Sequence, residues 1–117
     1  GGLMDYSVAK LANILFAAEL GRRMAGTGVT TYALHPGVVG TGIWRVLPKP
    51  LDALVKLFMI DSEEGAKTTL YCATSDAVAQ QSGLYYVKSA VATPTPVARD
   101  AALAQALWTA SEVWTKD

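Results

Sequence analysis

Tyr6 and Lys10 stand four residues apart in the segment MDYSVAKLANILFAAEL, which has the periodicity of a helix. Residues at positions i and i+4 share one helix face, so the phenol and the ammonium are expected to be neighbours. Bringing a tyrosine from its reference pKa of ~10 toward neutrality requires about 4 kcal/mol favouring the phenolate. An ammonium about 4 Å away supplies ~4 kcal/mol in a partly covered site but roughly 1 kcal/mol in bulk water. The pair therefore predicts an acid-base catalyst, provided that other atoms cover it.

The segments around this pair predict a helix followed by a buried strand. Between about residues 5 and 24, apolar side chains recur every three or four positions, and Arg22 and Arg23 suit the negative end of the helix dipole. Residues 29–34 (VTTYAL) are rich in β-branched and aromatic side chains, and the Pro36-Gly37 dipeptide follows them. We expect a strand that ends at this dipeptide.

The rest of the chain predicts further alternation of helices and strands. Glycines and prolines in residues 35–50 indicate a shaped loop. Residues 51–59 are apolar and compatible with a helix, and Ser62 with two following glutamates begins another helix that runs to about residue 73. Residues 84–87 (LYYV) predict a second strand, and a last helix is expected from about 100 to 114.

This order favours an α/β fold with a parallel sheet, because parallel strands need a crossover that a helix provides. Two strands are too few for such a sheet, whose polar edges need partners. We expect the missing strands to precede Gly1, and therefore interpret residues 1–117 as a fragment of a longer protein.

Composition excludes several other classes. Ten basic side chains balance ten acidic ones, so nucleic acid is not an expected partner, and no apolar run is long enough to span a bilayer. Cys72 is the only cysteine and has no disulfide partner, and no Cys/His cluster suggests a metal. We expect a single globular domain in a reducing, cytoplasmic setting, with Cys72 as a small buried hydrophobe.

Taken in order, four segments resemble the C-terminal half of a short-chain dehydrogenase/reductase, within the retinol dehydrogenase-like group. They are YSVAKLANILFAAEL, GTGVTTYALHPGVVGTGIWR, EGAKTTLYCA and SGLYY. The resemblance implies a Rossmann-type fold, doubly wound around a parallel sheet in three layers, that is incomplete in this chain. Residues 1–117 would form the catalytic and substrate half of that single domain, without the dinucleotide-binding half.

The same resemblance implies an NAD(P)-dependent oxidoreductase that interconverts an apolar alcohol and its aldehyde or ketone, and it favours NADP over NAD. Tyr6 would be the acid-base, and Lys10 would hold the nicotinamide ribose and assist the phenol. The glycine-rich turn and the Ser and Asn catalytic partners of the family are not among these residues, so the isolated chain is expected to be inactive. The residues that the resemblance assigns to cofactor binding are Tyr6, Lys10, Pro36, Gly37, Val38, Val39 and Thr41.

The unusually apolar segment from Gly42 to Met59 corresponds to the family's substrate lid. Three roles fit it: a pocket for an extended apolar substrate such as a retinoid, a lipid aldehyde or a steroid; contact with a membrane surface; and simple core packing. The candidate substrate residues are Ile43, Trp44, Leu47, Leu54 and Phe58.

Two further interpretations remain open for the chain. The helix that carries Tyr6 and Lys10 has an apolar stripe that suits a homodimer, so a non-catalytic interaction module derived from the same family is the alternative to an enzyme. His35 is the only histidine, and the resemblance gives it a structural role before the Pro-Gly turn rather than that of a catalytic base.

Overall fold

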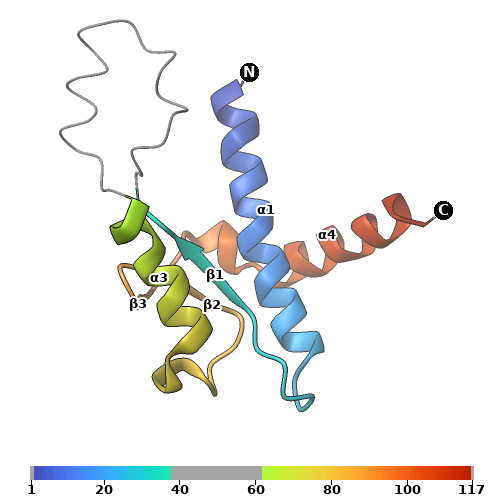
Figure 1. Ribbon diagram of the computed structural model, residues 1–117. Coiled ribbons are helices and arrows are strands. Elements are labelled where there is room, and N and C mark those ends of the chain that lie inside the picture. Colours follow the sequence, from blue (N-terminus) through green and yellow to red (C-terminus); the bar gives the residue numbers. More distant parts are fainter. Residues whose placement is uncertain (1, 38–61, 117) are drawn as a thin grey trace, which may run out of the picture.

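The computed structural model describes residues 2–37 and 62–116 (Figure 1). The predicted helix over residues 51–59 lies outside this part of the chain. Within these residues, the short 3-10 turns η2 (Asp76–Val78) and η3 (Pro96–Arg99) accompany the longer elements. These elements are α1 (Gly2–Arg23), β1 (Tyr32–His35), α3 (Ser62–Thr74), β2 (Leu84–Val87), β3 (Ala90–Ala92) and α4 (Ala101–Trp114).

The three described helices confirm the helical predictions for these segments, with small changes at their ends. α1 begins three residues earlier than expected and ends at Arg23. Gly26 and Gly28 then adopt φ values of +79° and +82°, a conformation that residues other than glycine rarely adopt. α4 is capped by Asp100, whose carboxylate accepts a hydrogen bond of 3.0 Å from the Leu103 N–H.

The two strands that the sequence predicted are parallel, as expected, but a third strand makes the sheet of the described residues mixed rather than parallel throughout. β1 and β2 are parallel, with Tyr32 opposite Leu84 and His35 opposite Val87. β3, which was not predicted, pairs antiparallel with β2. The strand order is β1-β2-β3, which leaves β1 at one edge among the described strands.

The hairpin between β2 and β3 explains why the third strand escaped prediction. Its two connecting residues, Lys88 and Ser89, have φ values of +50° and +57°. Two-residue hairpin turns with positive φ at both positions normally carry Asn or Gly, which gives a recognisable signal. Here the Ser89 N–H donates 3.1 Å to the hydroxyl of buried Thr68 in α3, a tertiary contact that helps hold an unfavoured conformation.

Alternation along the strands sends side chains to two faces of the sheet, and the closed core lies on the α3 face. Tyr86 is 1% exposed and clusters with Cys72 and Val78. The Tyr32 ring packs edge-on against Tyr86, with centroids 5.8 Å apart. The confinement of Cys72 in this core raises the pKa of its thiol through desolvation, which agrees with its predicted role as a small hydrophobe.

The opposite face of the sheet carries α1, and α4 packs against α1. The rings of Phe16 and Trp108 stack with centroids 5.5 Å apart, and the Arg23 guanidinium lies 4.5 Å from the Trp108 ring centroid. Arg22 and Arg23 both donate to Glu19, and these hydrogen bonds hold the pKa of Glu19 below its usual value. α1 is therefore anchored at its C-terminal half.

Gly21 marks the closest approach between α1 and the sheet. A Cβ atom there would lie 2.8 Å from the Thr31 hydroxyl and 3.0 Å from the Gly83 backbone. The Gly83 backbone cannot rotate away from this Cβ atom as a flexible side chain could. We therefore expect Gly21→Ala to lower the free energy of unfolding by about 1–2 kcal/mol in urea titrations, despite alanine's better helix propensity.

Gly2→Ala is the matched control for this substitution, because Gly2 lies in the same helix and a Cβ atom there would meet nothing within 4 Å. Its stability should equal or slightly exceed that of the wild type. Equal stability of the two variants would contradict the tight packing at Gly21.

Candidate active site

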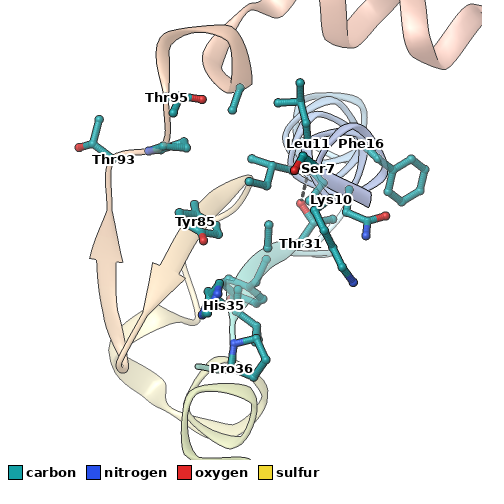
Figure 2. Close-up of a pocket in the computed structure, with 18 of the residues that line it drawn as sticks. Ser7, Lys10, Leu11, Phe16, Thr31, His35, Pro36, Tyr85, Thr93 and Thr95 are labelled. Carbon is teal, nitrogen blue, oxygen red and sulfur yellow. Dashed lines mark hydrogen bonds between the residues drawn. The ribbon is translucent and has the colours of Figure 1, made fainter. Parts of the chain in front are cut away.

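A cavity of about 980 Å³ opens between α1 and the sheet. Side chains on one face of α1, the end of β1 and the segment after β3 line it. Figure 2 shows Ser7 and Lys10 on the helix, with His35 and Pro36 below them and Thr93 and Thr95 across the opening. Four residues that the sequence assigned to one site therefore line one cavity: Tyr6, Lys10, Pro36 and Gly37.

Tyr6 and Lys10 are neighbours, as their spacing predicted. The Lys10 Nζ atom lies 5.3 Å from the centroid of the Tyr6 ring, which is within the range of a cation–π contact. Tyr6 is 61% exposed, so the ammonium and the phenol face solvent within the described residues. The geometry places the ammonium over the phenol ring, and no other described residue shields the two groups from water.

The helix that carries this pair is held against the sheet. Within the helix, the Ser7 hydroxyl donates 2.9 Å to the Leu3 carbonyl. At the anchored end, the Thr31 hydroxyl donates 2.7 Å to the carbonyl of Ala17. The Thr31 N–H in turn donates 3.1 Å to the Ser82 hydroxyl, which links the helix to the segment before β2.

Pro36 and Gly37 lie immediately after β1, at the carboxyl end of a parallel strand. Open α/β sheets bind ligands beyond such strand ends. Gly37 has a φ of +88°, a conformation that glycine adopts without strain, and its lack of a side chain lets a ligand approach the backbone. Its N–H donates 2.9 Å to Nδ1 of His35, the last residue of β1.

Several lining residues escaped the sequence prediction. Tyr85 lies on the cavity face of β2, whereas its neighbour Tyr86 is in the core. The alternation of residues 84–87 was a signal that could have separated these two tyrosines. Residues 93–95 line the far side of the cavity, and no signal pointed to them because the hairpin that brings them there was itself missed.

Other predicted site residues lie outside the described part of the chain. Among residues 2–37 and 62–116, no helix combines the length and apolar character needed to cross a membrane. The same residues contain no group of three or more side chains suited to hold a metal ion. The predicted residues outside the description are Val38, Val39, Thr41, Ile43, Trp44, Leu47, Leu54 and Phe58.

No protein-family model matches the sequence. Curated proteins do match it over nearly its whole length. Human retinol dehydrogenase 14 is 45% identical over 114 residues, which is 92% of this chain and 34% of that protein. Bovine dehydrogenase/reductase SDR family member 13 is 41% identical over 93% of this chain and 30% of that protein.

A more distant relative shares the same segment. The WW domain-containing oxidoreductase of Drosophila melanogaster is 37% identical over 94% of this chain and 28% of that protein. The chain thus spans about a third of the length of the curated relatives that it matches. With identities of 37–45% over more than nine tenths of its length, the chain belongs to the short-chain dehydrogenase/reductase family and resembles the retinol dehydrogenases in particular.

Proposed function

We propose that these residues supply the proton-transfer pair and part of the dinucleotide site of an NAD(P)-dependent oxidoreductase that interconverts an apolar alcohol and its carbonyl compound. The observation that carries this proposal is the convergence of Tyr6, Lys10, Pro36 and Gly37 on one cavity. These residues come from two elements separated in sequence. A helix face or a turn alone would not explain why they meet.

The lining of the cavity fits the nicotinamide half of a dinucleotide. Its volume of about 980 Å³ lies at the upper end of the range for ligand pockets. Lys10 offers an ammonium for ribose hydroxyls, and Gly37 offers backbone without a side chain at the strand end. When bound, the nicotinamide supplies or accepts the hydride. The resemblance favours NADP over NAD, and we extend that preference to this chain as a proposal.

The chemistry of this chain's own residues is proton transfer. In reduction the Tyr6 hydroxyl gives its proton to the carbonyl oxygen of the substrate, and in oxidation the Tyr6 phenolate takes the proton of the alcohol. Once water is excluded from the site, an ammonium held beside a phenolate stabilises it, because opposite charges attract several-fold more strongly than in water. Covering the pair is therefore a functional requirement.

We propose that the cover comes from further strands in the natural polypeptide. The outer edge of β1 has no strand partner among the described residues. Unpaired edges expose backbone groups that normally find a partner. The relatives' greater length agrees with an additional parallel strand beside β1, which would also shield the exposed N-terminal half of α1.

The proposed substrate is an extended apolar alcohol or aldehyde. One of the relatives described above is named a retinol dehydrogenase, which supports a substrate of that class for this chain. The apolar residues predicted to line the substrate pocket lie between residues 43 and 58, outside the described part. Apolar lining from Leu11 and Ile14 on α1 is consistent with the same substrate class.

A second candidate is a non-catalytic interaction module. The N-terminal half of α1 exposes Leu3 at 82%, together with Met4 and Val8, and such a surface suits a protein partner. This surface does not explain why Tyr6 and Lys10 share a cavity with a strand-end glycine turn, so the enzyme is favoured.

The function is tested with the natural polypeptide that contains these 117 residues. We expect it to oxidise all-trans-retinol with NADP and to transfer deuterium from deuterated NADPH to retinal, as measured by mass spectrometry of the product. The 117-residue chain alone should show no turnover, because Tyr6 stays exposed to water. Failure of deuterium transfer to retinal, decanal and a ketosteroid would refute the oxidoreductase proposal.

A further inference from the structure

His35 ends β1 with its imidazole at the border of the cavity, beside the Pro36–Gly37 turn (Figure 2). The Gly37 N–H donates to the His35 Nδ1 atom across two residues, at 2.9 Å. Asparagine and aspartate make the same kind of turn with a side-chain oxygen. Here an imidazole nitrogen takes the place of that oxygen.

This hydrogen bond fixes how the chain leaves the strand. Pro36 has no N–H, so the Gly37 amide is the first backbone donor after β1. The proline ring also restricts His35 to extended backbone, which suits the end of a strand. With its amide held by His35, Gly37 keeps a φ of +88°. The turn is therefore held by the proline ring and by the imidazole together.

The same geometry argues against His35 as a catalytic base. A neutral imidazole has one lone pair, and the Gly37 amide occupies it on Nδ1. The proton of this tautomer is on Nε2, which then acts only as a donor. Taking a proton from a substrate would require the imidazole to release the turn.

We propose that His35 is a positioning residue, whose Nδ1 atom holds the Pro36–Gly37 turn in the shape that receives the nicotinamide end of the dinucleotide. This inference rests on the proposed function, because it takes the turn to be part of the cofactor site. The imidazole acts through Gly37 and does not touch the reacting atoms. Its effect is therefore expected on cofactor affinity rather than on the chemical step.

The test compares His35→Leu, which removes the acceptor, with His35→Asn, whose side-chain oxygen can accept from the same amide. His35 is exposed within the described residues, so neither substitution disturbs the core that they form. Fluorescence titration with NADPH should give a dissociation constant about 5-fold higher for His35→Leu, because one hydrogen bond no longer favours the turn conformation that binds, and a wild-type value for His35→Asn. Turnover at saturating cofactor should change less than 2-fold, because the activation barrier of the chemical step stays nearly the same.

A second measurement does not depend on the cofactor. In NMR spectra the Gly37 amide proton should have a larger chemical shift in the wild type and in His35→Asn than in His35→Leu, where its hydrogen bond is lost. Equal NADPH affinity in all three proteins, or an unmoved Gly37 signal, would overturn the role of His35. If none of the three proteins bound NADPH or NADH, the proposed function itself would fail, and the positioning role would fail with it.

Discussion

The Tyr6→Phe variant of the natural polypeptide is expected to lose turnover by roughly 10²–10⁴-fold, the usual contribution of a positioned acid-base group. Phenylalanine keeps the ring that packs beneath the Lys10 ammonium and removes only the hydroxyl that moves the proton. Cofactor binding should remain within about 3-fold of the wild type, a change that corresponds to less than 1 kcal/mol. Steady-state turnover of an apolar aldehyde with NADPH, alongside fluorescence titration of NADPH, measures both quantities.

Tyr85→Phe is the matched control for this substitution. Tyr85 also lines the cavity but lies on β2, and it has no predicted part in proton transfer. Its variant should retain most of the wild-type rate. A Tyr6→Phe enzyme with more than about a tenth of that rate, which corresponds to a barrier change under ~1.4 kcal/mol, would show that another group carries the proton.

Replacing Tyr86 with alanine is expected to destabilise the protein by about 3–5 kcal/mol, as for large aromatic side chains in a closed core. The ring is 1% exposed and lies between Tyr32 and Tyr71 on the α3 face of the sheet. Losses of this size are a large fraction of the total stability of most domains. Urea unfolding followed by tryptophan fluorescence and circular dichroism measures the change.

Tyr86→Phe separates the ring from its hydroxyl. The hydroxyl donates to the Gln81 side chain, and burial raises the pKa of Tyr86, so it stays protonated at neutral pH. Loss of that hydrogen bond should cost about 1 kcal/mol. If Tyr86→Ala cost no more than Tyr86→Phe, the tyrosine cluster would not be the core of this face.

The elements that the sequence predicted correctly are those with strong local signals. α1 and α4 have long apolar periodicity, and Asp100 and the paired arginines mark their ends. The strand at residues 84–87 is rich in aromatic side chains, which favour a half-buried sheet. β3 is short and follows a turn of Lys88 and Ser89, whose conformation depends on a contact with α3 that no local pattern reveals.

One part of the candidate site also follows from local signals in the sequence, and the other part depends on tertiary packing. The spacing of Tyr6 and Lys10 fixes their common face on any helix, so their adjacency follows from local geometry. Their meeting with Pro36 and Gly37 depends on how α1 crosses the sheet, which rests on the close approach at Gly21 and the hydrogen bond from Thr31. The resemblance to a known family predicted that meeting, whereas the residues alone did not.

The most direct test of the proton-transfer pair is a crystal structure of the natural polypeptide with NADP and an apolar alcohol. We predict that the Tyr6 hydroxyl lies within hydrogen-bond distance of the alcohol oxygen, with the Lys10 ammonium on the nicotinamide ribose and Gly37 beside the nicotinamide. A nicotinamide bound elsewhere, with Tyr6 still open to solvent, would contradict this prediction.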